Sequence, residues 1–202
     1  MNEIAQTCNM KTLISCIGRR LTQPNIPMKP EILKGRHERK GIEIEMDDPL
    51  NGILRRENEK SNVLMEASAT YNGNVYDLLK ADPNVDFFTK DFENSFIEAS
   101  LKDGKTFILK SYAIRGYKHE GYNCHLQNWK LEGQKASNGE WIVLDSHSNE
   151  PFNKLVVKTF NVSCEEELKA VKLTQEGYNI HNGNYLFRIN AFDIFGILIN
   201  DN

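Results

Sequence analysis

Two runs of alternating apolar and polar residues, 128–133 and 140–145, constrain the fold of this chain more than any other feature. Each run carries one of the two tryptophans, Trp129 and Trp141. Alternation with a period of two is typical of half-buried strands. The segment between the runs ends in Asn138 and Gly139, and both residues tolerate the positive φ of a tight hairpin turn. The pattern therefore predicts a β-hairpin at the centre of an all-β core, with at least one tryptophan largely buried.

Further strand-like runs follow one another beyond residue 50, separated by turns rich in Gly and Asn. They cover 63–70, 95–101, 106–117, 155–162, 170–175, 185–189 and 191–199. Within 106–117 the inward candidates are Phe107 and Leu109, then Tyr112 and Ile114, so we expect a β-bulge between the two pairs. Many short strands with almost no helix predict a sandwich or a jelly roll.

Two short helical turns are expected beside these strands. The first follows Gly52, with Ile53 and Leu54 packing inward at the start of the folded domain. The second covers 165–169, because Ser163 and Glu166 have the spacing of a capping box.

The N-terminal part of the 202-residue chain differs in composition from the rest. Three prolines lie between positions 24 and 30, and residues 34–40 form a basic run. Prolines at this spacing preclude a regular helix. We therefore expect an irregular or disordered tail over residues 1–48 and one domain over residues 49–200. The basic run is either a docking patch or a solvated part of the tail.

Charge and hydropathy exclude several classes of partner. The net charge of −3 argues against nucleic acid, because phosphate binding depends on a basic face. No apolar run approaches the roughly 20 residues of a membrane helix, so membrane insertion is not expected. The first residues lack a basic segment followed by an apolar one, which predicts a cytoplasmic protein.

The four cysteines, Cys8, Cys16, Cys124 and Cys164, lack CxxC spacing and are predicted to be free thiols.

Several sequence blocks occur in the order known from one family of domains. They cover residues 81–89, 111–115, 128–133, 141–145, 184–187 and 192–196. Over about residues 50–199 the chain resembles the discoidin domain, also called the coagulation factor 5/8 type C domain. The resemblance implies an all-β, galactose-binding-like jelly-roll β-sandwich with a flexible N-terminal tail. Residues 49–53 and 112–115 are most similar to the intracellular, BTB-associated type. No cysteine lies near Ile53 or Gly196 for the disulfide of secreted members.

The resemblance also implies where a ligand binds, because this family uses loops at one end of the sandwich. The corresponding loops lie around 71–74, 86–90, 117–126 and 178–184, and the last two are expected to converge around one shallow concavity. The predicted ligand-binding residues are Arg115, Tyr117, Lys118, His119, Tyr122, His125, Tyr178, Asn179 and His181. Aromatic rings beside hydrogen-bonding groups suit a peptide, a sugar face or a carboxylate. Arg115 either clamps a ligand carboxylate or pairs internally with an acid such as Glu98 or Asp193.

No cofactor is predicted. Asp82, Asn84 and Asp86 alternate in a way that could offer oxygen ligands to a structural calcium ion, although such alternation is common in turns. A zinc site built from Cys124, His125 and either His119 or His147 lacks a second thiolate at ligand spacing.

The chain is not predicted to be an enzyme. Cys124 and His125 are adjacent in sequence, so on a strand they would point to opposite faces and could not form a nucleophile–base pair. The sequence contains no nucleophile elbow, phosphate loop or dinucleotide fingerprint.

Three functional hypotheses follow. The first is a non-catalytic recognition module that binds a protein or peptide through the loops at one end of the sandwich. The alternative is a carbohydrate-binding, lectin-like module that uses the same loops. The third is a hydrolase on a galactose-binding-like scaffold. The expected partner is thus a protein or peptide, or else a glycan.

Overall fold

The computed structural model describes residues 41–120, 125–179 and 183–200. Its elements, in chain order, are β1 (Gly41–Ile44), α1 (Ile53–Asn58), β2 (Val63–Ala67), β3 (Thr70–Asn72), the 3₁₀ helix η1 (Val75–Leu79), β4 (Phe88–Thr89), β5 (Phe96–Leu101), β6 (Thr106–Arg115), β7 (Trp129–Lys135), β8 (Trp141–His147), β9 (Val157–Asn161), β10 (Leu168–Gln175) and β11 (Ala191–Ile199). All strand pairs are antiparallel. The all-β prediction is confirmed.

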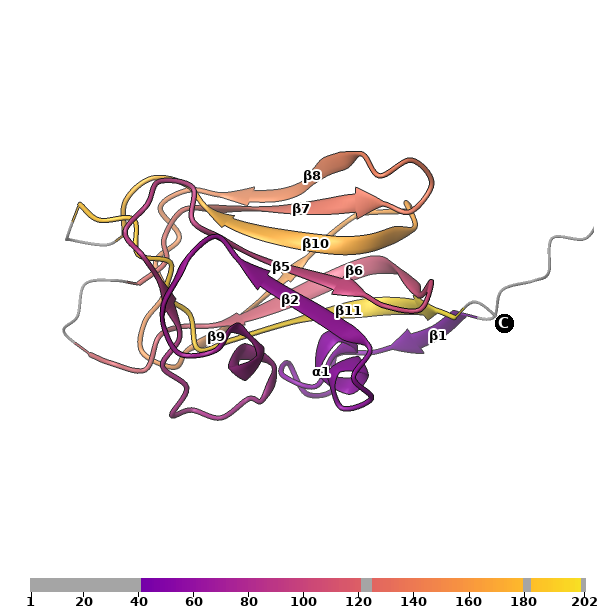
Figure 1. The fold of residues 1–202 in the computed structure, drawn as a ribbon, viewed down its shortest axis with the longest axis horizontal. Helices are drawn as coiled ribbons and strands as arrows, with labels where there is room; N and C mark the ends of the chain where they lie inside the picture. The colour runs from indigo at the N-terminus through magenta and orange to yellow at the C-terminus, as the bar shows by residue number, and fades with distance from the viewer. Residues whose placement is uncertain (1–40, 121–124, 180–182, 201–202) are drawn as a thin grey trace, which may run out of the picture. The chain divides into compact units, whose positions relative to one another are not determined.

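The strands form two layers that enclose the core (Figure 1). One layer has the order β8–β7–β10–β5–β2, and the other has the order β9–β6–β11–β1. A single bridge between Leu168 and Phe107 joins β10 to β6 and so connects the layers. The short strands β3 and β4 pair with each other outside this arrangement. Within the described ranges, no helix is both long and apolar enough to cross a membrane.

The hairpin with the two tryptophans is confirmed. Strands β7 and β8 pair in antiparallel register, and Gly139 in the connecting turn has a φ of +77°. Trp129 is completely buried, whereas Trp141 is half-buried. The Trp129 indole N–H donates to the Tyr112 hydroxyl at 3.0 Å. That hydroxyl donates in turn to the Asp145 carboxylate at 2.9 Å, so one buried tyrosine on β6 ties the two layers together.

The predicted β-bulge in β6 is also confirmed. Leu109 pairs with Gly196 and Ser111 pairs with Phe195, which leaves Lys110 as the extra residue. Phe107, Leu109, Tyr112 and Ile114 are completely buried, as expected. A Cβ atom at Gly196 would lie 2.1 Å from the Ile108 carbonyl oxygen. Only glycine therefore fits opposite the bulge.

The short helix α1 is held by a buried carboxylate from the far end of the chain. Ile53 and Leu54 are completely buried, as predicted. Asp193 on β11 accepts hydrogen bonds from the backbone N–H groups of Gly52 at 2.7 Å and Leu54 at 2.9 Å. Burial raises the pKa of Asp193 to about 6, although these N–H donors oppose the rise. Asp193 thus satisfies the first N–H groups of a helix that has no local side-chain cap.

Three predictions on local structure are wrong. Residues 165–169 form no helical turn, because Leu168 is completely buried in β10 and Glu167 accepts a hydrogen bond from Thr106 at 2.6 Å. Residues 185–189 contain only an isolated bridge between Arg188 and Phe88 and no strand. Residues 41–44 were assigned to the tail but form β1, which pairs with β11 at the edge of its layer. The rest of the predicted tail, residues 1–40, lies outside the described residues.

Candidate functional site

The loops predicted to bind a ligand gather at one end of the sandwich. Strands β6 and β10 end there and β7 and β11 begin there, at the left of Figure 1. The side chain of Gln127 donates to the Tyr178 carbonyl oxygen at 3.1 Å, and the Glu176 N–H donates to the Asn128 carbonyl oxygen at 3.0 Å. We call this end the rim and define it as residues 70–95, 116–120, 125–128, 176–179 and 183–190, together with Arg115 at the end of β6. Two predicted ligand-binding residues, Tyr122 and His181, lie outside the described residues.

Arg115 is buried at the base of the rim. Its side chain is 8% exposed, and its Nε donates to the Asn190 side-chain oxygen. The predicted internal partners are wrong, because Glu98 pairs with Lys172 at 2.9 Å and Asp193 caps α1. Within the described chain, Arg115 Nη2 is buried and has no hydrogen-bond partner. Burial lowers the pKa of this guanidinium, whereas Asp82 nearby opposes that shift.

Tyr117 lies beneath the rim surface and does not form an exposed platform. Only 3% of the residue is exposed, and its hydroxyl donates to the Asp86 carboxylate at 2.5 Å. Its neighbour Lys118 donates to the Asn84 carbonyl oxygen at 2.9 Å and lies 3.6 Å from the Asp86 carboxylate. Both residues therefore fasten the segment around Asp86 to the end of β6.

The two described histidines of the rim differ in exposure. His119 is exposed, and its ring centre lies 5.3 Å from that of Tyr117. His125 is buried, and its Nδ1 lacks a hydrogen-bond partner in the described ranges. Burial lowers the pKa of His125, and a hydrogen bond with the His119 backbone only partly offsets this effect. The lowered pKa favours a neutral imidazole at pH 7.

Tyr178 and Asn179, neighbours in the sequence, also differ in exposure. Tyr178 is 51% exposed, and its ring centre lies 4.6 Å from that of Tyr185. A hydrogen bond between these two hydroxyls raises the pKa of Tyr185 to about 12. Asn179 is buried and donates to the Asn184 side-chain oxygen at 3.0 Å. Its own Oδ1 has no partner in the described part of the chain.

A stacked group of side chains in the rim is not indicated by any pattern in the sequence. The Tyr71 and Phe88 rings stack with centres 5.2 Å apart. The Arg188 guanidinium carbon lies 3.7 Å from the centre of the Phe88 ring and 4.9 Å from the centre of the Tyr117 ring. Tyr71, at the outer end of this stack, is 69% exposed. We call these four residues the aromatic–arginine stack. Tyr71 and Phe88 belong to loops that the resemblance implied, but Arg188 was in a segment predicted to be a strand.

The alternating residues considered as calcium ligands are engaged in other hydrogen bonds. Asp82 accepts from the Asn84 backbone N–H at 2.8 Å and from its side chain at 3.1 Å. Asp86 accepts from Tyr117. His147, considered for zinc, contacts Asp145 at 2.9 Å and stacks on Trp129. No group of His, Cys, Asp and Glu suited to a metal ion occurs among the residues with described positions.

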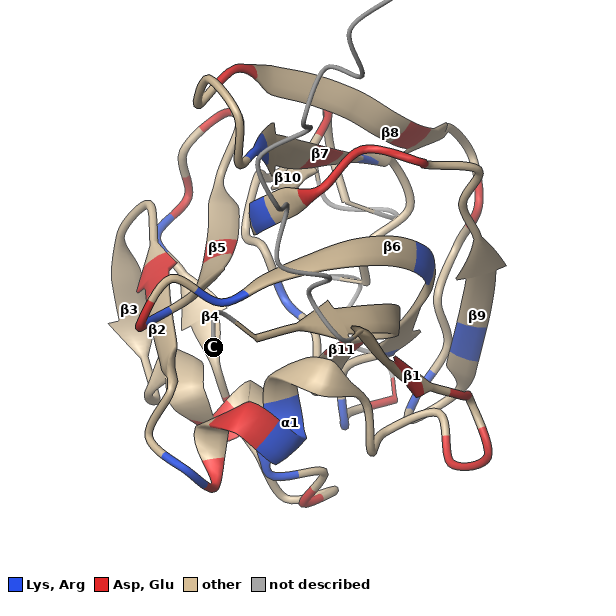
Figure 2. Cartoon of the chain, turned by 90° about the vertical axis from the view of Figure 1, so that its right-hand side faces the viewer, with Lys and Arg blue, Asp and Glu red and all other residues tan. Residues whose placement is uncertain are grey.

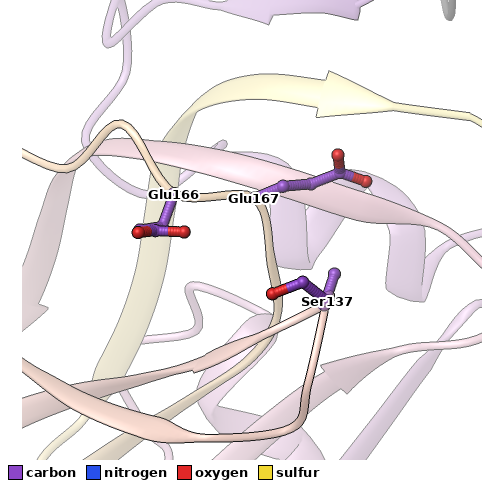
Figure 3. Close-up of a pocket in the computed structure, with 4 residues that line it drawn as sticks. Ser137, Glu166 and Glu167 are labelled. Carbon is purple, nitrogen blue, oxygen red and sulfur yellow. The ribbon is translucent and has the colours of Figure 1, made fainter.

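A shallow hollow lies at the opposite end of the sandwich, onto which Figure 2 looks. Residues from the β7–β8 turn and from the segment before β10 line it, and Ser137, Glu166 and Glu167 are labelled in Figure 3. The two glutamate side chains point away from each other in that view. Glu166 lies 3.6 Å from the Lys135 ammonium group, and Glu167 accepts a hydrogen bond from Thr106. Because both carboxylates have partners, we place the candidate site at the rim.

No protein-family model and no curated protein matches this sequence. Several solved structures share its fold. CpGH89CBM32-5 from Clostridium perfringens, in complex with GalNAc-β-1,3-galactose, has a TM-score of 0.53 at 12% identity, covering 68% of this chain and 97% of that chain. The family 32 carbohydrate-binding module of Clostridium perfringens NanJ, in complex with galactose, has a TM-score of 0.53 at 14% identity, covering 67% and 95%. The F5/8 type C domain of a Bacteroides fragilis protein has a TM-score of 0.54 at 11% identity, covering 68% and 93%.

These similarities correct the first functional hypothesis. Carbohydrate-binding modules, some of them solved with bound sugars, contradict the protein- or peptide-binding hypothesis and favour the carbohydrate-binding alternative. The intracellular BTB-associated subtype and the cytoplasmic location stay predictions. At identities of 11–14%, what the comparison shows is the fold. The chain has the galactose-binding-like β-sandwich fold shared by discoidin-type domains and family 32 carbohydrate-binding modules.

Proposed function

We propose that the protein is a non-catalytic carbohydrate-binding module whose rim binds the sugar. The proposal rests on one observation, which is that exposed aromatic rings and buried side chains with unused hydrogen-bonding atoms occur together in the rim. Its exposed large aromatic rings are Tyr71, Phe92 and Tyr178. Its unused buried atoms are Arg115 Nη2, His125 Nδ1 and Asn179 Oδ1.

Both kinds of group match the surface of a sugar. A pyranose has a C–H face that packs on an aromatic ring, and hydroxyl groups around its edge that donate and accept hydrogen bonds. Buried polar atoms in native proteins usually have partners, so each atom without one in the described chain requires an explanation. Hydroxyl groups of a bound sugar can supply such partners once the side chains that cover these nearly inaccessible atoms move aside. The sugar complexes of the C. perfringens modules support this assignment.

The scaffold fits recognition at a preformed site. The Tyr71 ring stacks on Phe88, which in turn lies against the Arg188 guanidinium, and the Tyr178 ring packs against Tyr185 with ring centres 4.6 Å apart. Two contacts also hold the Tyr178 backbone, since the side chains of Gln127 and Asn128 donate to its carbonyl oxygen at 3.1 and 3.4 Å. Side chains held in this way lose little conformational entropy when a ligand binds.

A glycan array probed with the full chain tests the proposal, and calorimetric titration of a retained glycan then gives the affinity. Tyr71→Ala and Tyr178→Ala should each weaken binding about 10-fold, because removing one ring from a stacked contact costs about 1–2 kcal/mol. Both side chains are largely exposed, so the melting temperature should change by only a few degrees.

Val143→Ala is the matched control, because Val143 lies on β8 outside the rim and is 61% exposed. It should leave the affinity unchanged. The proposal fails if the array retains no glycan, or if Val143→Ala weakens binding as much as the two tyrosine variants.

A further inference from the structure

The rim contains two guanidinium groups without a carboxylate partner. Neither Arg115 nor Arg188 forms an ion pair with any described Asp or Glu. Arg188 Nε and Arg115 Nη2 are both buried and lack hydrogen-bond partners in that part of the chain. A buried charge without a partner is costly, and proteins almost always pair such a group.

Several acidic residues of the rim have partners of their own. Asp86 receives the Tyr117 hydroxyl and the Lys118 ammonium group. Asp91 accepts the Tyr185 N–H at 2.6 Å, and Glu120 pairs with Lys154 at 3.4 Å. These three carboxylates are engaged elsewhere, and no described Asp or Glu lies within ion-pair distance of either guanidinium, although Asp82 is close enough to act on the charge of Arg115.

Arg188 is the better placed of the two to meet a ligand. Its guanidinium carbon lies 3.7 Å from the centre of the Phe88 ring and 4.9 Å from that of the Tyr117 ring, and the residue is only half-buried. Arg115 is more deeply buried and is held by Asn190, whose amide donates in turn to the carbonyl oxygens of Pro83 and Val85. A guanidinium stacked on rings keeps its N–H edge available, and this planar fork matches the two oxygens of a carboxylate.

We propose that the saccharide bound at the rim is acidic and that Arg188 binds its carboxylate. This inference rests on the proposed carbohydrate-binding function and names the class of sugar, one that contains a hexuronic acid unit. Arg115 contributes positive potential from beneath, whereas the exposed ring of Tyr71 packs on the C–H face of the sugar.

Calorimetric titration of the full chain with matched sugar pairs tests this inference. The pairs are the methyl glycosides of galactose and galacturonic acid and those of glucose and glucuronic acid, together with the methyl esters of both acids. The acid of the preferred pair should bind at least 10-fold more tightly than its neutral counterpart and its ester. Added salt should weaken the acid more than the neutral sugar, because screening acts on charges.

Arg188→Met should reduce affinity for the acid about 10- to 100-fold, the range for losing charge-assisted hydrogen bonds, and leave the neutral sugar nearly unchanged. Methionine is long enough to keep packing against Phe88, and a thermal melt verifies the fold. Arg188→Lys keeps the charge without the fork and should fall between wild type and Arg188→Met. Lys90→Met removes an exposed positive charge elsewhere in the rim and should have a small effect on both sugars.

The outcomes separate this inference from the function on which it rests. Equal binding of acid, ester and neutral sugar would overturn the role of Arg188 while preserving carbohydrate binding. An equal loss in Lys90→Met and Arg188→Met would overturn it as well, because general electrostatics would then explain the preference. If no saccharide binds, in solution or on the array, the proposed function itself fails.

Discussion

Replacing Trp129 by alanine is expected to lower the free energy of unfolding by about 3–5 kcal/mol, a large part of a typical total of about 5–15 kcal/mol. The indole is completely buried and packs against His147, Phe152 and Phe160, with ring-centre distances of 4.7, 5.3 and 5.4 Å. Its removal leaves a cavity between the layers and deprives the Tyr112 hydroxyl of a donor. Urea denaturation followed by circular dichroism measures the change.

Trp141→Ala is the matched control, because it lies in the same hairpin but is only half-buried. The Lys172 ammonium group lies 4.1 Å from the centre of its ring. We expect a smaller loss of stability than for Trp129→Ala. If both substitutions cost less than about 1 kcal/mol, the hairpin does not belong to the core.

Acidification is expected to remove about 3 kcal/mol of stability through Glu57 alone. This completely buried carboxylate on α1 accepts hydrogen bonds from Lys105 at 2.5 Å, Lys60 at 2.7 Å and Asn62 at 2.9 Å. Burial tends to raise the pKa of Glu57, but the three donors outweigh it and lower the pKa from 4.5 to about 2. A carboxyl group with a lowered pKa stabilises the folded state above pH 4.5, and the contribution disappears as the pH falls to about 2.

The Glu57→Gln variant isolates this contribution. At pH 7 it should be less stable than the wild type by about 3 kcal/mol, and the difference should shrink steadily between pH 4.5 and pH 2. The difference in unfolding free energy between the two proteins cancels the contributions of carboxylates that both contain. One of these is Asp193, whose raised pKa makes the folded state less stable as the pH rises from 3.8 to 6. Glu150→Gln removes a more exposed partner of Lys158 and should cost less than about 1 kcal/mol. A difference that does not vary with pH would contradict the assignment.

The parts of the fold that could be predicted depend on neighbours in sequence. The β7–β8 hairpin follows from alternation and an Asn-Gly turn, and the bulge at Lys110 follows from a phase change between Leu109 and Tyr112. The capping-box prediction failed because it too relied on local spacing, whereas a contact distant in sequence decided the structure there. Local spacing favoured a helical turn at 165–169, but burial of Leu168 in the sheet outweighed it.

The rim could be predicted only in outline. Its loops converge as expected, because antiparallel strands return to the same end of the sheet. The burial of Tyr117 and Arg115 could not be read from the sequence, since both are polar residues at the end of a predicted strand, where a side chain can face either solvent or the core. Aromatic and basic residues in a loop can face solvent or pack inward, and loop composition is the same in either case.

The contacts that stabilise α1, and those that stabilise the rim, each join residues far apart in the chain. Asp193 reaches Gly52 across 141 positions, and the aromatic–arginine stack joins Tyr71, Phe88 and Tyr117 to Arg188. Side-chain alternation is a local property, so the amino-acid order specifies which segments become strands and which face is apolar. The contacts between a guanidinium group and an aromatic ring depend on how those strands pack, and no local sequence pattern predicts them.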